Sequence, residues 1–190
     1  MVNIPDGFKI MYTGNIGEAQ NFELIIDAAI RLKEHKNIKW VFVGSGRKIE
    51  YIKEKINEHN LENIYLPGNF SIIYMPYFFS KADVMLVSLK DELIFNITVP
   101  AKLQAYMGYG KPIIGLLKGE GANIIREANC GYVCSQSDSS ELVNTVLDFE
   151  KTTETLRTKM SINAKEYYNQ NFSKEKNFNT LEKFYFSNSG

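Results

Sequence analysis

The stretch that decides the fold class runs Thr98-Val-Pro-Ala-Lys-Leu-Gln-Ala-Tyr-Met-Gly-Tyr-Gly-Lys-Pro-Ile-Ile114. Pro100 suits the first turn of a helix, because the N–H that proline lacks would have no partner there. Residues 101–109 are predicted to form a short helix, which Gly110 ends before an apolar strand begins at Ile113. Lys102 lies in the first turn of that helix, where free backbone N–H groups favour anions. The stretch therefore predicts a site for a phosphorylated ligand where a loop enters a helix.

Strand and helix patterns alternate along the rest of the chain. Apolar runs that stop at turn residues predict six strands, at residues 8–13, 39–43, 63–66, 84–88, 113–117 and 131–134. Amphipathic spacing predicts helices between them, at residues 21–34, 47–59, 71–80, 101–109 and 121–128, the third broken or kinked near Pro76. Regular alternation is typical of a parallel sheet with helices on both faces and right-handed crossovers. The predicted fold class is α/β, a Rossmann-like six-stranded parallel sheet.

The chain becomes wholly helical after Phe149. We expect residues 1–150 to form the Rossmann-like domain and residues 151–186 to form helices that pack on it, at 153–169 and 173–186. Asp138 and Glu141 resemble a capping box for the helix that follows the last strand, within the first of these regions. Residues 187–190 are expected to be a disordered tail.

Composition disfavours several classes of function. The 190 residues suffice for one large domain or two small ones, and 22 basic and 22 acidic residues give no electrostatic case for nucleic-acid binding. No apolar run could span a bilayer and the N-terminus lacks a secretion signal, so the expected compartment is the cytoplasm. Cys130 and Cys134 are too few for a disulfide framework, and no histidine or second cysteine pair accompanies them as a metal site would require. We expect both to pack as apolar side chains.

Ligands of open α/β sheets bind at the carboxyl ends of the strands. Five loops are predicted there: Gly14-Asn15-Ile16-Gly17, Gly44-Ser45-Gly46-Arg47, Pro67-Gly68-Asn69-Phe70, residues 91–102, and Gly119-Glu120-Gly121-Ala122. Glycine lets a backbone approach a ligand closely, but it is also the ordinary turn residue. Neither a G-x-G-x-x-G fingerprint nor a G-x-x-x-x-G-K-[ST] motif occurs, which disfavours an NAD-dependent dehydrogenase. His35 and His59 lie on predicted helix surfaces, and no Ser-His-Asp or Cys-His set is apparent.

Asp91 and Glu92 directly follow the apolar strand at residues 84–88, on the predicted ligand side of the sheet. Two carboxylates at this place could accept hydrogen bonds from sugar hydroxyls, or they could be solvated loop charges. The residues alone leave both interpretations open.

Several motifs of the chain occur together in one protein family. Residues 12–17 read Tyr-Thr-Gly-Asn-Ile-Gly, residues 42–46 contain a V-G-x-G turn, and residues 82–87 match an A-D-V-x-L strand. Residues 100–113 follow the pattern P-x-K-L-x-x-Y-M-x-x-G-K-P-I. With these motifs the chain resembles the C-terminal, nucleotide-sugar-binding half of GT-B glycosyltransferases of glycosyltransferase family four (glycosyl transferases group 1). The last pattern, together with Asp91-Glu92, is similar to the bacterial O-antigen and capsule subgroup that includes N-acetyl-fucosamine transferases.

The resemblance implies one half of a GT-B fold and a retaining sugar transfer from a nucleotide diphosphate sugar, a UDP-sugar ahead of a GDP-sugar. The implied acceptor is a sugar or a lipid-linked sugar. No metal ion or other cofactor is implied, because a helix dipole and cationic side chains neutralise the leaving group. The implied site has three parts: base and ribose near Gly44, Gly46, Arg47, Gly68, Asn69, Phe70 and Gln104; the diphosphate near Gly14, Asn15, Gly17, Gln20, Val99 and Lys102; and the donor sugar near Asp91, Glu92 and Thr98.

The chain departs from the family pattern at two places. Many members carry Arg and Lys near the first loop to hold the diphosphate, where this chain has Asn15 and Gln20. Many also carry a ribose-binding Glu where this chain has Ala105, with Gln104 beside it, and an amide lacks the charge-assisted strength of a carboxylate. We therefore expect Lys102, with Arg47 as a second cation, to carry more of the phosphate interaction.

A complete GT-B enzyme also has an N-terminal acceptor domain of similar size, which these 190 residues do not supply. We expect a fragment, or one half of a two-chain enzyme at the inner face of a membrane, that alone binds donor weakly and transfers no sugar. Two alternatives stay open. One is a non-catalytic sugar-nucleotide-binding or partner module that completes a separate N-terminal subunit. The other is half of a GT-B type sugar-nucleotide epimerase, which the segment 100–112 fits less well.

Overall fold

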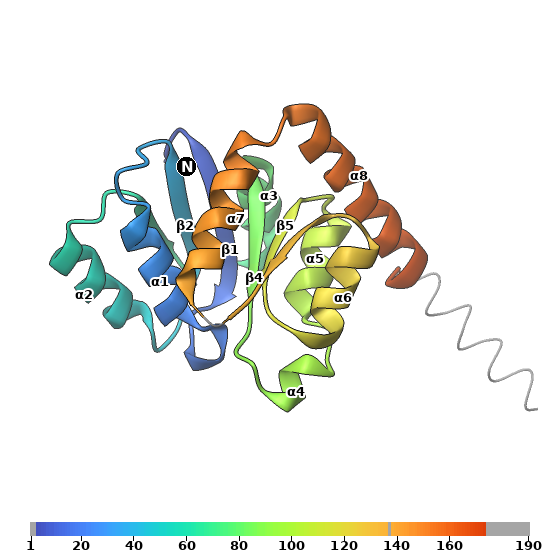
Figure 1. Ribbon diagram of the computed structural model, residues 1–190, viewed down its shortest axis with the longest axis horizontal. Coiled ribbons are helices and arrows are strands. Elements are labelled where there is room, and N and C mark those ends of the chain that lie inside the picture. Colours follow the sequence, from blue (N-terminus) through green and yellow to red (C-terminus); the bar gives the residue numbers. More distant parts are fainter. Residues whose placement is uncertain (1–2, 137, 174–190) are drawn as a thin grey trace, which may run out of the picture.

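The structure, a computed structural model, describes residues 3–136 and 138–173, in which a parallel sheet lies between two layers of helices (Figure 1). The sheet has the strand order β3-β2-β1-β4-β5-β6, and all its pairs are parallel. The predicted Rossmann-like six-stranded sheet is therefore confirmed for the described residues. The strands are β1 (Phe8–Asn15), β2 (Ile38–Ser45), β3 (Ile64–Gly68), β4 (Val84–Ser88), β5 (Ile113–Leu116) and β6 (Gly131–Cys134).

The strand order reverses at β1, which pairs with β2 on one side and with β4 on the other. The pairing with β2 runs in register from Phe8 opposite Ile38 to Asn15 opposite Ser45, whereas β4 meets β1 only at Ile10 and Met11. In open α/β sheets a ligand crevice forms at such a reversal, beyond the carboxyl ends of the strands. The topology thus directs attention to the loops that follow β1 and β4.

Helices of two kinds connect the strands. Within the described residues the α-helices are α1 (Phe22–Arg31), α2 (Ile49–His59), α3 (Met75–Lys81), α4 (Leu93–Asn96), α5 (Ala101–Gly108), α6 (Gly119–Glu127), α7 (Ser139–Lys151) and α8 (Glu154–Asn171). Two short 3₁₀ turns, η1 (Glu18–Gln20) and η2 (Ile72–Tyr74), lie in the loops after β1 and β3.

Two apolar cores lie on opposite faces of the sheet. One contains Trp40 and is covered by α1, α2 and α7, and the other contains Tyr106 and is covered by α3, α5 and α6. Because successive residues of a strand point to opposite faces, each strand supplies both cores, which explains the continuous apolar runs in the sequence. Helix α8 takes part in both, with Met160 in the first core and Ala164 in the second, and it packs against α5 (Figure 1).

The structure differs from the sequence predictions in a few elements. The helix predicted at residues 71–80 is a 3₁₀ turn followed by α3, and Pro76 lies in the first turn of α3, where its missing N–H needs no partner. The four-residue helix α4 interrupts a segment predicted as a loop, and the other boundaries shift by a few residues. The predicted helix at residues 173–186 and the tail at 187–190 lie outside the described residues, apart from position 173.

The predicted helix ends are present with two differences: Pro100 is the N-cap residue just before α5, and of the predicted capping box the structure shows the Asp138 half. The Asp138 carboxylate accepts a hydrogen bond from the Ser140 N–H at 2.6 Å, and so caps α7. Gly110 follows α5 with φ +64°, a conformation that glycine adopts readily. None of the described helices is long and apolar enough to cross a membrane.

Candidate functional site

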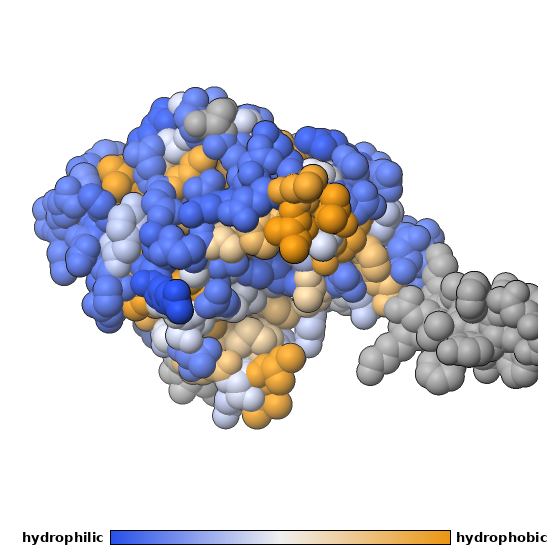
Figure 2. Space-filling model, turned by 90° about the horizontal axis from the view of Figure 1, so that it is seen from below, coloured by the Kyte–Doolittle hydropathy of each residue, from blue (hydrophilic) through white to orange (hydrophobic). Residues whose placement is uncertain are grey.

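The loops predicted to meet the ligand gather at one edge of the sheet, the lower edge in Figure 1. The loops after β1 and β2 are joined there by backbone hydrogen bonds, from Ile16 N to Ser45 O at 2.8 Å and from Lys48 N to Ile16 O at 3.0 Å. Figure 2 looks onto this edge and shows a mainly hydrophilic surface with separate hydrophobic groups. The loops after β1 and β2 are therefore hydrogen-bonded to each other and form one continuous surface.

The glycines of these loops have different structural roles. A Cβ on Gly44 would lie 1.9 Å from the Gly14 carbonyl oxygen, and one on Gly46 would lie 2.3 Å from the Ile16 carbonyl oxygen. These two glycines are required for the packing of the β2 loop against the β1 loop. Gly68, in contrast, has no atom within 4 Å of its Cβ position, so the end of β3 borders open space.

Lys102 lies in the first turn of α5 and reaches the end of β1. Its Nζ lies 3.8 Å from the centroid of the Tyr12 ring and donates a hydrogen bond to the Tyr12 hydroxyl. The Nζ also lies 3.8 Å from the Cβ position of Gly14. Burial lowers the pKa of Lys102 to about 7. The structure thus brings the ammonium group of a lysine in the first turn of α5 to the end of β1, at the point where the strand order reverses.

The lysines at this edge other than Lys102 are already paired with carboxylates. Lys48 forms ion pairs with Glu23 at 2.5 Å and with Glu18 at 3.0 Å. Lys102 and the exposed Arg47 form no ion pair with any carboxylate of the described residues. An anionic ligand would therefore find two cations whose charge is not compensated.

Asn15 and Gln20 build the first loop. The buried Gln20 accepts hydrogen bonds through its Oε1 from Gly17 N at 3.0 Å and from Asn15 Nδ2 at 3.4 Å. Its backbone carbonyl accepts a hydrogen bond from the Ser88 hydroxyl at 2.7 Å, which ties the loop to the end of β4. These two amide side chains stabilise the shape of the loop, but they are neutral, so the positive charge near the loop comes from other residues.

Asp91 braces the loop that leads to α5. Its carboxylate accepts a hydrogen bond from Asn96 Nδ2 at 2.8 Å and forms an ion pair with Lys118. Hydrogen bonds from Asn96 and Lys118 lower the pKa of Asp91. Gly119 packs closely here too, because its Cβ position lies 1.9 Å from the Asn96 carbonyl oxygen. Asp91 therefore has structural partners, whereas Glu92 is exposed at the start of α4.

The remaining predicted residues lie in different environments. The Thr98 hydroxyl donates to the Ile94 carbonyl at 2.9 Å, and Val99 packs against the core that contains Tyr106. Phe70 packs against Phe78 with ring centroids 4.9 Å apart, Asn69 is exposed, and Gln104 is partly buried on α5. The structure therefore brings the predicted segments to one edge, but the side chains of Val99 and Phe70 pack against the core.

Helix α4 exposes apolar side chains beside this edge. Leu93 is 79% exposed, Ile94 62% and Ile97 70%. The hydrogen bond of Thr98 and the ion pair of Asp91 hold this segment in place.

Two buried tyrosines were not indicated by the sequence patterns: Tyr12, which contacts the site lysine, and Tyr106, a core residue that supports the end of β1 through Thr13. Tyr12 is fully buried beside Lys102, and Tyr106 accepts a hydrogen bond from Thr13 N at 3.0 Å. A tyrosine two residues before the loop glycine, and another four residues after a helix-start lysine, are the sequence signals that could have indicated them.

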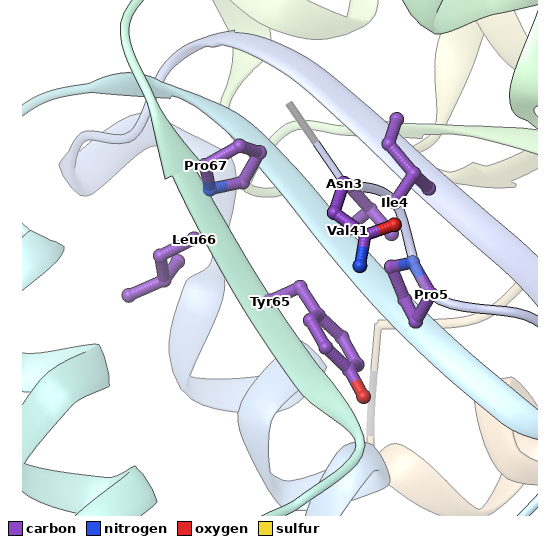
Figure 3. Close-up of a pocket in the computed structure, with 7 residues that line it drawn as sticks. All are labelled: Asn3, Ile4, Pro5, Val41, Tyr65, Leu66 and Pro67. Carbon is purple, nitrogen blue, oxygen red and sulfur yellow. The ribbon is translucent and has the colours of Figure 1, made fainter. Parts of the chain in front are cut away.

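A separate cavity of about 200 Å³ lies on the face of β3, between this strand and the N-terminal segment (Figure 3). Its lining contains no charged side chain and consists of Asn3, Ile4, Pro5, Val41, Tyr65, Leu66 and Pro67. This cavity therefore offers nothing for an anion. Among the described residues no group of three or more His, Cys, Asp or Glu could hold a metal ion.

Comparison with known proteins identifies the family of this chain. A family model described as glycosyl transferases group 1 matches residues 2–167. The chain belongs to this family. This group 1 chain is also similar to WcaI of Escherichia coli (strain K12), whose name assigns it provisionally to colanic acid biosynthesis as a glycosyl transferase. The two are 30% identical over 110 residues, which are 57% of this chain and 26% of WcaI.

Solved structures share the fold of this group 1 chain. Anabaena HepE, in complex with UDP, has a TM-score of 0.77 at 17% identity, over 93% of this chain and 49% of HepE. The C-terminal domain of LpcC, a glycosyl transferase group 1 family protein from Francisella tularensis, has a TM-score of 0.70 at 18% identity, over 90% of this chain and 89% of that domain. At these identities the likeness shows the fold alone. The chain spans about half the length of HepE, and its match covers about a quarter of WcaI.

Proposed function

We propose that this chain is the donor-binding half of a retaining glycosyltransferase that builds bacterial surface polysaccharide. The donor is a nucleotide diphosphate sugar, with a UDP-sugar ahead of a GDP-sugar. One observation carries the proposal: the Lys102 ammonium, without a carboxylate partner among the described residues, lies at the N-terminus of α5 where the strand order reverses. Membership of the group 1 family and the similarity to HepE, which was solved with UDP, support it.

Different residues of the site bind different parts of the donor. The diphosphate meets Lys102, the N-terminal N–H groups of α5 and the backbone of residues 14–17, with Arg47 as a second cation. Base and ribose lie along Gly44, Gly46, residues 68–70 and Gln104. The donor sugar faces residues 91–98, where Glu92 is exposed and Asp91 keeps the loop in place.

The chemistry asked of these residues is stabilisation of charge. When the bond from the sugar to the diphosphate breaks, negative charge develops on the leaving phosphate oxygen. A protonated Lys102 and the positive end of the α5 dipole are fixed where that charge appears, so little reorganisation is needed. No metal ion or other cofactor takes part in this proposal.

The acceptor and the second half of the enzyme belong to the proposal as well. We place an N-terminal acceptor domain, of the same or a partner chain, opposite the edge shown in Figure 2. A sugar or lipid-linked sugar is the acceptor, and the exposed apolar side chains of α4 agree with a lipid-linked one. Alone, the 190-residue chain binds donor weakly and transfers no sugar.

The test is a thermal-shift and calorimetric screen of the purified chain with UDP, GDP and their sugars. Binding to the folded state raises the melting temperature, with a stabilisation of about 2.7 kcal/mol at a hundredfold excess over the dissociation constant. Lys102→Ala should remove the shift. Lys111→Ala is the matched control, because Lys111 is a partly buried lysine just past the other end of α5, with its Nζ 3.1 Å from the Ala82 carbonyl oxygen.

Five outcomes would each overturn a part of this proposal. A well-folded protein that binds none of the UDP or GDP compounds has no donor site. A shift that persists in Lys102→Ala removes the diphosphate from α5. Sugar transfer by the chain alone would contradict the prediction that the isolated chain is inactive. If the chain binds donor but transfers no sugar after an acceptor domain is added, the non-catalytic module is favoured. If it interconverts donor sugars, the epimerase half is favoured.

A further inference from the structure

The ring of Tyr12 is fixed by the apolar core. Tyr12 is fully buried, and its ring packs edge-to-face on Phe22, with centroids 5.1 Å apart. Phe22 in turn packs edge-to-face on Phe42 at 5.3 Å. Three interlocked aromatic rings leave the phenol one position, with its hydroxyl at the end of β1.

The Tyr12 hydroxyl joins α5 to the loop after β1. It donates its proton to the Asn15 carbonyl and accepts a hydrogen bond from Lys102 Nζ. A phenol has one proton, so the bond to Asn15 leaves only its lone pairs for the lysine. The hydroxyl is thus oriented as an acceptor for an ammonium group.

The contact also connects the two faces of the sheet. Tyr12 belongs to the core covered by α1, α2 and α7, whereas Lys102 comes from α5 on the opposite face. The lysine reaches the phenol beside Gly14, whose Cβ position is 3.8 Å from Nζ. A long lysine side chain has many rotamers, and this contact selects one of them before any ligand is present.

We propose that Tyr12 is a positioning residue of the anion site, whose hydroxyl holds the Lys102 ammonium at the loop after β1 so that a diphosphate meets it in place. The identity of the ligand rests on the function proposed above. The contact itself is independent of that function.

The charged and titratable surroundings of Lys102 are simple. The Tyr12 phenol contacts Lys102, and Tyr106 lies four residues further along α5 with its hydroxyl bonded to Thr13. Burial raises the pKa of both phenols, so both stay neutral below pH 9. Burial lowers the pKa of Lys102, and no carboxylate among the described residues opposes this effect. Any change in lysine titration on loss of the Tyr12 hydroxyl therefore reports on that hydroxyl.

The first experiment follows the lysine without any ligand. In the full chain, the ¹³Cε chemical shift of Lys102 is titrated in wild type, Tyr12→Phe and Tyr106→Phe. An acceptor favours the charged lysine, so Tyr12→Phe should lower the midpoint by about 0.5 pH unit or more. Tyr106→Phe is the matched control, because it removes a buried hydroxyl that bonds Thr13 and not the lysine. Equal midpoints in wild type and Tyr12→Phe would overturn the inference.

The second experiment measures binding of UDP-glucose by calorimetry between pH 6 and 9. This ligand has no phosphate group that titrates near neutrality, unlike UDP itself. Tyr12→Phe should weaken binding about 3- to 10-fold. It should also lower the pH above which affinity is lost. Tyr106→Phe should change affinity less than about 2-fold. Tyr12→Met, which also lacks the hydroxyl, is measured in parallel in case Tyr12→Phe does not fold.

The two proposals fail in different ways. If wild type does not bind UDP-glucose, UDP or GDP, the proposed function fails, while the lysine titration still decides the role of Tyr12. If wild type binds and Tyr12→Phe and Tyr106→Phe lose affinity equally, Tyr12 is a core residue and the positioning role is wrong.

Discussion

Lys102 is the residue whose environment is least explained by folding alone. Its ammonium group is buried enough to lower its pKa to about 7, and no carboxylate of the described residues pairs with it. A buried cation without a counter-ion reduces the stability of the folded state. A site for an anion needs this arrangement, because a ligand then supplies the missing charge.

This lysine gives the folded protein a specific dependence on pH. Between pH 7 and the ordinary lysine pKa, the unfolded chain holds a proton that the folded chain has released. The lysine's contribution to the free energy of unfolding therefore rises with pH, by up to about 1.4 kcal/mol per pH unit, and is lowest below pH 7. Lys102→Met should remove this slope, so the stability of wild type relative to the variant should increase from pH 7 to 8.5 in urea denaturation.

In the difference between wild type and Lys102→Met, the contributions of the other titrating groups to the pH dependence of stability cancel. Burial also raises the pKa values of phenols and thiols in this protein, which gives both proteins the same opposite slope at high pH. Gln104→Met, on the same helix, removes no titratable group and should differ from wild type by a constant amount. A difference for Lys102→Met that is equally constant would contradict the prediction.

At the scale of elements, α8 sets the position of α5 and so of Lys102. The two helices approach closely at Gly108, whose Cβ position lies 3.2 Å from the Tyr168 ring. Ala164 of α8 is fully buried in the core to which α5 contributes. Because Gly108 and Ala164 are small, α8 can pack closely on α5 and so fix the position of the helix that carries Lys102.

Enlarging Ala164 should therefore disturb this contact. Ala164→Leu adds volume to a filled core, and we expect a loss of about 1–3 kcal/mol in the free energy of unfolding by urea denaturation. Ile162→Leu, on the same helix at a side chain 52% exposed, should stay within about 0.5 kcal/mol of wild type. Equal effects of the two substitutions would mean that α8 does not pack tightly on α5.

At the scale of the whole molecule, one sheet serves two cores. Successive residues of β1 enter opposite cores, Met11 on one face and Tyr12 on the other. Neither core can form without the sheet, so we expect a single cooperative unfolding transition. The chain contains one tryptophan, the buried Trp40, and its two cysteines lie in different cores, Cys130 on the face opposite Trp40.

These residues report on the two faces separately. In Cys134→Ala, Cys130 is the only thiol, and its reaction with a thiol reagent monitors one core while Trp40 fluorescence monitors the other. The two urea transitions should have the same midpoint and slope. Exposure of Cys130 at a lower urea concentration than the change at Trp40 would show that the faces unfold independently.

The amino-acid sequence by itself determined the parts of this protein that depend on local pattern. Apolar runs placed the strands, proline and glycine placed the start of α5 and its end, and Asp138 placed the start of α7. The same local motifs indicated the family and located Lys102 in a first helical turn. Each of these depends on neighbours a few residues away.

Tertiary structure alone decided which distant side chains meet. Lys102 and Tyr12 are 90 residues apart in the chain, and Asp91 and Lys118 are 27 apart. No periodicity links such pairs, because they become neighbours only when the strand order brings β1, β4 and β5 together and the helices pack across them. The sequence therefore indicated a lysine at a helix start, and packing supplied the phenol that holds it and the ion pair that braces its loop.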